Sequence, residues 1–92
     1  MNMYAQYLAD TVDELRAFAA TDEGRQWDSS WYDGVADLVD RVIEQNTDEE
    51  AENLLGMLMR RVVDSGPLND RFAPSLHQAV DAMQRKQRRP RR

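Results

Sequence analysis

The segment from Trp31 to Gln45 has the clearest pattern of apolar and polar positions in the chain. At about 100° of rotation per residue, its apolar side chains gather on one side of a helix. These side chains are Trp31, Val35, Leu38, Val39 and Val42. The opposite side carries four carboxylates, Asp33, Asp37, Asp40 and Glu44. The pattern predicts an amphipathic helix whose acidic face meets either water or a basic partner.

A helix is also predicted before this segment, from about Met3 to Ala20. Residues that are mostly apolar share one face there at helical spacing. They are Tyr4, Leu8, Thr11, Val12, Leu15 and Phe18. The polar segment 21–25 interrupts the pattern, and Gly24 is the expected turn. The next helix then begins with either Asp28 or Ser30 as its N-cap, since both side chains can accept a hydrogen bond from the first turn.

Two further helices follow. Thr47 and Glu50 have the spacing of a capping box, so a helix should start there and run to about Asp64, before Gly66. Its predicted core stripe contains Leu54, Leu55, Leu58 and Val62. A last helix should start at Pro74 and fade near Gln84. In the linker before it, Leu68 and Phe72 can close one end of a bundle.

Four amphipathic segments with short connections predict an all-α fold, since no run of β-branched residues alternates with period two. We expect a small compact antiparallel bundle of about four helices with a flexible basic C-terminal tail. Residues 1–84 would form this single helical domain, and residues 85–92 a disordered tail. A three-helix core with a loosely docked last helix, or a dimer that shares helices, stays open at this stage.

Charge is distributed unevenly along the 92 residues, whose formal net charge is −5. The segment 85–92 holds six basic residues and no acid, so the other six basic residues stand against all 17 acids in 1–84, a net charge of −11. An acidic body with a basic end is typical of a chain with an interaction arm. The chain has no cysteine, which excludes disulfides and thiolate metal sites.

The candidate partner-binding residues are the acidic row, the acidic start of the next helix and one tryptophan in a loop. They are Asp33, Asp37, Asp40, Glu44, Glu49 and Trp27. Carboxylates stacked along one helix point apart, whereas a metal ion needs ligands that converge. A di-iron site in a helical bundle requires a glutamate three residues before a histidine. The single histidine, His77, has no glutamate at that position. We therefore expect no metal, cofactor or catalytic site.

The basic tail is the second candidate site. Its cations could contact phosphates of nucleic acid, dock on the acidic surface of the same or another copy, or have no dedicated target. They are Arg85, Lys86, Arg88, Arg89, Arg91 and Arg92. No aromatic residue is interleaved among them, and the acidic body repels polyanions.

These features favour a small protein-interaction module, such as an adaptor, inhibitor or immunity-type protein, that presents carboxylates to a basic protein partner without catalysis. The alternatives are a nucleic-acid-associated accessory protein that uses the tail, and a homo-oligomeric helical protein. The second alternative would use Met57, Ile43 and Val63, which lie at the margins of their apolar stripes. We expect a cytoplasmic protein with no membrane partner, because the N-terminus lacks the pattern of a signal peptide and no apolar run approaches about 20 residues.

Overall fold

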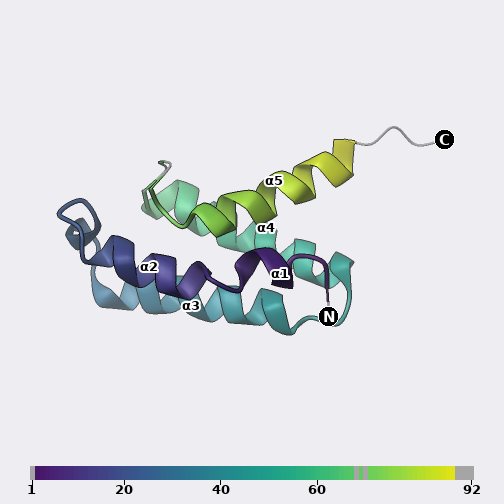
Figure 1. The fold of residues 1–92 in the computed structure, drawn as a ribbon, viewed down its shortest axis with the longest axis horizontal. Helices are drawn as coiled ribbons and strands as arrows, with labels where there is room; N and C mark the ends of the chain where they lie inside the picture. The colour runs from purple at the N-terminus through teal and green to yellow at the C-terminus, as the bar shows by residue number, and fades with distance from the viewer. Residues whose placement is uncertain (1, 68, 70, 89–92) are drawn as a thin grey trace.

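The computed structural model describes residues 2–67, 69 and 71–88. In these residues the chain forms five α-helices and one short 3-10 helix. In chain order they are α1 (Ala5–Leu8), α2 (Thr11–Ala19), η1 (Gly24–Gln26), α3 (Ser29–Glu44), α4 (Asp48–Ser65) and α5 (Pro74–Arg88). The two short helices α1 and α2 together form one arm, which lies along α3, and α5 contacts both of them (Figure 1). The predicted all-α bundle of about four helical segments is confirmed.

The first helical segment differs from the prediction, because it is broken at Ala9 and Asp10. Asp10 has φ −98° and ψ 0°, at the margin of the right-handed helical region and away from the regular α-helical values. Aspartate and the threonine that follows it have low helix propensity, so the break costs little here. The apolar spacing from Tyr4 to Phe18 continues regularly across the break, which is why the sequence pattern predicts one uninterrupted helix.

The core is formed by the faces that the apolar pattern predicts. On α3 and α4 the buried residues follow one another at three- and four-residue spacing, and most have no exposed surface. They are Trp31, Val35, Val39 and Val42 on α3, and Ala51, Leu55, Leu58 and Val62 on α4. Leu38 and Leu54 lie half-buried at the edges of the two faces. The last helix also belongs to the core, because it buries Leu76, Ala79, Val80 and Met83.

Two side-chain caps fix where α3 and α4 begin. Asp28 is the N-cap of α3, and its Oδ1 accepts a hydrogen bond of 2.9 Å from the Trp31 amide. Of the two predicted caps for this helix, Asp28 is therefore the right one, and Ser30 instead donates its hydroxyl to Asp28. The predicted cap of α4 is confirmed, since Thr47 Oγ1 accepts from the Glu50 amide at 3.2 Å. Both caps satisfy amides that helical hydrogen bonds cannot reach.

Aromatic side chains close one end of the bundle. Phe72 is completely buried between Phe18 and Trp31, with ring centroids 5.3 and 5.7 Å away. The prediction that Phe72 closes an end is confirmed, while Leu68 lies outside the described residues. Gly66, directly after α4, lies against the Trp31 ring so closely that a Cβ there would overlap the ring.

The end of α5 needs a second correction, because this helix runs through Arg88 rather than fading near Gln84. Arg85 pairs with Asp81 one turn earlier at 2.6 Å, and Lys86 reaches α4, so contacts within the chain hold these turns. Basic residues also suit the negative end of a helix dipole. Residues 89–92, the rest of the predicted tail, lie outside the described residues.

Asn2 closes the other end of the bundle with one side chain. Its amide nitrogen donates to the carbonyl oxygens of Val42 at 2.7 Å and Gln45 at 2.9 Å, at the end of α3. Its Oδ1 accepts from the amides of Tyr4 and Ala5 at 3.0 and 3.1 Å. Asn2 thus caps the end of α3 and the start of α1 together.

Replacing Leu58 by alanine should lower the free energy of unfolding by about 2–5 kcal/mol, because it leaves a cavity in the fully buried face of α4. The neighbouring Met57 is 55% exposed, so Met57→Ala is the matched control and should change stability by less than about 0.5 kcal/mol. Urea denaturation followed by circular dichroism measures both. Equal losses for the two variants would contradict the assignment of the buried face.

Asn2→Asp keeps the size of the side chain but replaces its N–H donors with a carboxylate beside two carbonyl oxygens. It should cost about 1–3 kcal/mol of stability at neutral pH. Gln6→Glu makes the same chemical change at an exposed position of α1 and should be nearly neutral. Thermal unfolding of the two variants tests this, and an Asn2→Asp protein as stable as the control would show that the double cap contributes nothing.

Candidate functional site

The acidic row on α3 lies on the solvent side of the helix. Asp33, Asp37, Asp40 and Glu44 are all exposed, opposite the buried valines of the same helix. Of these four carboxylates, only Asp37 forms an ion pair within the described residues, with the Arg41 guanidinium at 3.2 Å. The other three carboxylates make no side-chain hydrogen bond or ion pair with any part of the chain that the structure describes. Their charges are therefore available to a partner.

The acidic start of α4 divides into two groups. Glu49 and Glu50 are exposed, whereas Asp48 and Glu52 are half-buried and make contacts within the chain. Asp48 Oδ1 accepts the Met3 amide at 2.8 Å. Glu52 Oε2 accepts both the Tyr4 hydroxyl and the Lys86 ammonium, each at 2.7 Å. Glu52 thus joins α4 to the segment before α1 and to α5.

Electrostatics keep Glu52 charged and Tyr4 neutral. Burial and the hydrogen bond to Glu52 raise the pKa of Tyr4 well above its ordinary value. Burial opposes the charged form of Glu52, but the hydrogen bonds from Lys86 and Tyr4 outweigh it and lower the pKa of Glu52. The hydrogen bond to Glu52 in turn raises the pKa of Lys86. At neutral pH this cluster holds a carboxylate and an ammonium against a neutral phenol.

Other acidic side chains have structural roles as well. Glu14 on α2 accepts the Ser75 amide at 2.8 Å and the Ser75 hydroxyl at 2.6 Å, so it caps the first turn of α5 from another helix. Glu23 accepts the side-chain amide of Asn69 at 2.5 Å. The hydrogen bond from Ser30, and then that from the Trp31 amide, lower the pKa of Asp28. Glu14, Glu23 and Asp28 therefore have structural roles, in contrast to the exposed acidic residues described above.

Trp27, the predicted aromatic contact, is half-buried and makes contacts within the chain. Its indole N–H donates to the carbonyl of Ser65 at the end of α4 at 2.7 Å. Its ring packs against Trp31, with centroids 6.1 Å apart. A structural role at the aromatic end therefore accounts for Trp27.

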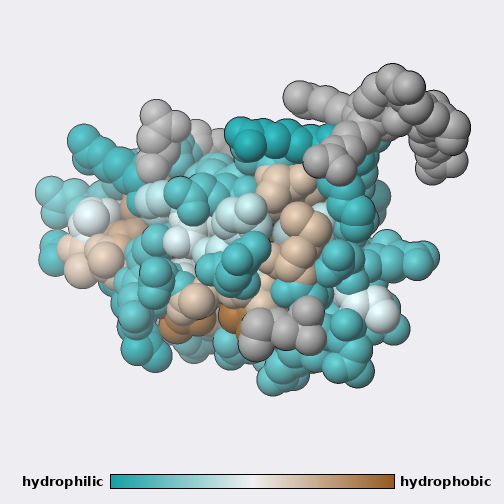
Figure 2. All heavy atoms as spheres, turned by 45° about the vertical axis from the view of Figure 1, so that its right-hand side comes forward, coloured by the Kyte–Doolittle hydropathy of each residue, from teal (hydrophilic) through white to brown (hydrophobic). Residues whose placement is uncertain are grey.

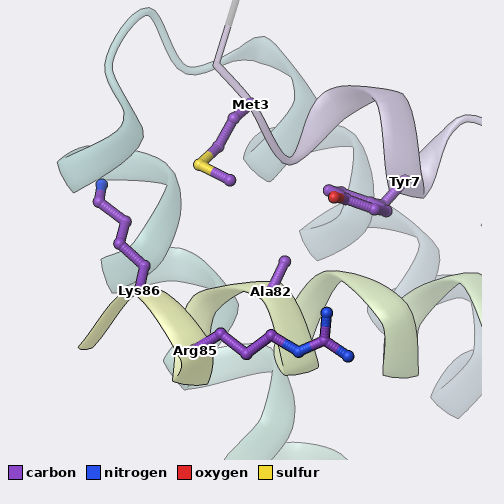
Figure 3. Close-up of a pocket in the computed structure, with 5 residues that line it drawn as sticks. All are labelled: Met3, Tyr7, Ala82, Arg85 and Lys86. Atoms are coloured by element: carbon purple, nitrogen blue, oxygen red, sulfur yellow. The ribbon is translucent and has the colours of Figure 1, made fainter. Parts of the chain in front are cut away.

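Two of the predicted basic residues, Arg85 and Lys86, line a groove with Met3, Tyr7 and Ala82 (Figure 3). The groove has a volume of about 340 Å³ and lies between the N-terminal segment with α1 and the last turns of α5. Arg88 belongs to α5 by its backbone. Arg89, Arg91 and Arg92 lie outside the described residues. Of the alternatives for the tail, docking on the chain's own acidic surface is seen for Lys86, which pairs with Glu52 and lies 3.9 Å from Asp48.

The rest of the described surface offers little further chemistry. Hydrophilic residues cover most of the face in Figure 2, and apolar atoms appear there in small patches. His77 is half-buried, and its Nε2 has no hydrogen-bond partner among the described residues. Within residues 2–67, 69 and 71–88, no three histidine or carboxylate side chains converge as metal ligands would. No helix in that part of the chain is long and apolar enough to cross a membrane.

No known family model, curated protein or solved structure matches this chain. A functional proposal has to come from the residues themselves. The sequence predicts where the exposed acidic row lies, but it does not reveal the structural role of Glu52 or Asn2. A weak signal exists for Glu52, which lies one turn after Asp48 and three residues before the buried Leu55, at the edge of the apolar stripe.

Replacing Glu52 by glutamine should lower stability near pH 7 by about 1–2 kcal/mol, because a charge-assisted hydrogen bond is lost. The folded pKa of Glu52 lies below its ordinary value of 4.5, so the carboxylate stabilises the fold above about pH 4.5. This contribution is lost as the pH falls through the lowered pKa. The difference between wild type and Glu52→Gln should therefore shrink from pH 6 towards about pH 3.

Urea denaturation at several pH values measures this difference, with Glu44→Gln as the control at an exposed position. The control should differ from wild type by less than about 0.5 kcal/mol at every pH. A Glu52→Gln deficit that stays constant over this range would mean that the charge of Glu52 does not stabilise the fold.

Proposed function

We propose that this chain is a small protein-interaction module that presents the acidic row of α3 to a basic surface of another protein, without catalysis. The proposal rests on a difference between two groups of acidic residues, those with contacts inside the chain and those without. Asp33, Asp40 and Glu44 are exposed and make no described contact, whereas Glu14 and Glu52 are used to hold helices together. Carboxylates with no structural role remain free to bind cations.

The rigidity of α3 sets the geometry of the proposed contact. Asp33 and Glu44 are eleven positions apart, which is about 16 Å at the rise of an α-helix. The buried Val35, Val39 and Val42 hold the opposite face of the helix. A partner would therefore need cations spread along one line over about three helical turns.

The charge of residues 1–84, a net of −11, supports the same function. A dense negative field steers association with cationic surfaces and disfavours acidic partners. An adaptor, inhibitor or immunity-type protein would use the field in this way, and we expect it to act in the cytoplasm.

The two alternative functions have less support. Of the tail cations whose side chains the structure describes, Arg85 pairs with Asp81 and Lys86 pairs with Glu52, so these two do not support a free phosphate-binding arm. For an apolar oligomer interface, Met57 and Val63 are indeed 55% and 53% exposed. They are six positions apart on α4 and so point about 120° away from each other, which does not make one apolar patch.

The proposal predicts a specific loss when the row is reversed in charge. The double variant Asp33→Lys, Asp40→Lys should bind a fluorescein-labelled nona-arginine peptide at least about 10-fold more weakly than wild type at low salt. Fluorescence anisotropy measures the binding. The matched control is Asp22→Lys, Asp64→Lys, which makes the same change in net charge at exposed positions outside the row.

The control should weaken binding by no more than about 3-fold, because it retains the row. If both double variants weaken binding equally, the peptide senses only net charge, and the row is not a binding surface. Wild-type protein that fails to bind the peptide at all at low salt would also contradict the proposal.

A further inference from the structure

The side of α4 that faces away from the core carries opposite charges at its two ends. Glu49 and Glu50 lie in the first turn, and Arg60 and Arg61 follow them eleven positions later. Eleven residues make three helical turns plus about 20°, so each arginine lies almost directly along the helix from one glutamate, about 16 Å away. All four side chains are exposed, whereas the opposite side of α4 is buried.

These four charged groups are not paired inside the chain. Among the described residues, none of them belongs to an ion pair. The Arg61 guanidinium lies against the α3 backbone at Gly34, where an added Cβ would overlap it. Arg85 and Lys86 on α5, in contrast, are already paired with the chain's own carboxylates. The charges at both ends of α4 are therefore available to a partner.

A glycine that packing within the chain does not explain lies in the middle of this side of α4. At Gly24, Gly34 and Gly66 an added Cβ would overlap a neighbouring atom, which accounts for each of them. At Gly56 an added Cβ would meet nothing within 4 Å. A glycine inside a helix lowers stability relative to alanine. The close approach of a second backbone would give Gly56 a role.

The residues around this glycine suit such an approach. Met57 is 55% exposed, and Asn53, one turn before it, is exposed as well. A methionine side chain is flexible and fills irregular gaps, such as the one that a glycine leaves on a facing helix. We define the outer face of α4 as these residues together with the four charged ones: Glu49, Glu50, Asn53, Gly56, Met57, Arg60 and Arg61.

We infer that two copies of this chain pair through the outer face of α4, with the two α4 helices antiparallel. Glu49 and Glu50 of each copy then lie beside Arg60 and Arg61 of the other, and the methionine of each copy lies beside Gly56 of the other. A parallel arrangement would place like charges together, so charge selects the antiparallel one. A two-fold axis relates the helices, so each contact forms twice and the assembly closes as a dimer.

Charge selects a second copy as the occupant of the outer face. The face matches its own reversed copy, because both signs lie on one helix at equal distances from its middle. A partner with cations alone would match the first turn of α4 and be repelled by Arg60 and Arg61. The pairing therefore does not need the single apolar patch that Met57 and Val63 fail to make.

This dimer should be weak, because one helix face buries less surface than a stable interface does. We expect a dissociation constant between micromolar and millimolar. Salt screens exposed charges, so raising the salt from about 20 mM to about 300 mM should weaken pairing.

A charge-swap experiment tests the pairing. One variant, Glu49→Lys with Glu50→Lys, makes both ends of the outer face basic, and a second, Arg60→Glu with Arg61→Glu, makes both ends acidic. Each variant alone should dimerise at least about 10-fold more weakly than wild type, because like charges meet in both contacts. An equimolar mixture should recover the wild-type dissociation constant to within about 3-fold, since every contact between the two variants joins opposite charges.

The matched controls reverse two exposed charges elsewhere. Asp33→Lys with Asp40→Lys changes the net charge as the first variant does, and Arg16→Glu with Arg25→Glu changes it as the second does. Both controls should dimerise within about 3-fold of wild type. Sedimentation equilibrium at about 20 mM salt measures all samples, and circular dichroism checks that each variant is folded.

Gly56→Gln tests the close approach of the helices without any change in charge. Glutamine favours a helix more than glycine does, and its Cβ has open space, so the variant should fold at least as stably as wild type. It should nevertheless dimerise at least about 10-fold more weakly, because its side chain separates the two backbones. Ala17→Gln, at an exposed position of α2, is the control and should dimerise like wild type.

Three results would overturn the inference. They are wild-type protein that stays monomeric at millimolar concentration, a mixture of the two charge variants that fails to recover, and a Gly56→Gln protein that dimerises like wild type. The proposed function is tested separately, because the acidic row of α3 is not part of the outer face. A protein that binds the arginine peptide through Asp33 and Asp40 but never dimerises would overturn the pairing alone.

Discussion

The burial of the α3 face against the rest of the bundle is the constraint on which the structure depends. Val35, Val39 and Val42 on α3, and Leu55, Leu58 and Val62 on α4, have no exposed surface. A chain of 92 residues has few apolar side chains to spare, so its net stability rests on these two faces. Once they are paired, the register of α3 turns its carboxylates outward. The acidic row is thus a geometric consequence of the core.

Aromatic contacts at one end of the bundle and polar contacts at the other add to the packing of the apolar faces. At one end, Phe72 and Trp31 fill the space between helices, and at the other Asn2 and Glu52 join segments that are far apart in the sequence. The acids therefore fall into two classes. Some, such as Glu14 and Glu52, are held by hydrogen bonds and stabilise the fold, while Asp33, Asp40 and Glu44 of the row on α3 make no such contact with the described residues. This division is the basis for proposing an interaction surface.

Sequence reasoning succeeds here where the cause is local. The faces of α3 and α4 follow from helical periodicity, and the caps at Asp28 and Thr47 follow from contacts three residues apart. Sequence reasoning fails where a residue's contact partner is distant in the sequence. The contact of Asn2 with Val42 spans 40 residues and that of Tyr4 with Glu52 spans 48, so no short pattern reveals them. The extra turn of α5 similarly depends on Lys86 reaching α4.

Native-state amide hydrogen exchange tests the central claim most directly, because it reports the free energy of opening at each backbone amide. If the paired faces of α3 and α4 hold the fold, the slowest amides should lie in residues 35–42 and 55–62 and should exchange only through global unfolding. The amides of residues 84–88, at the exposed end of α5, should exchange much faster. Equal protection in these regions, or faster exchange in the middle of α3 than at the end of α5, would contradict the account.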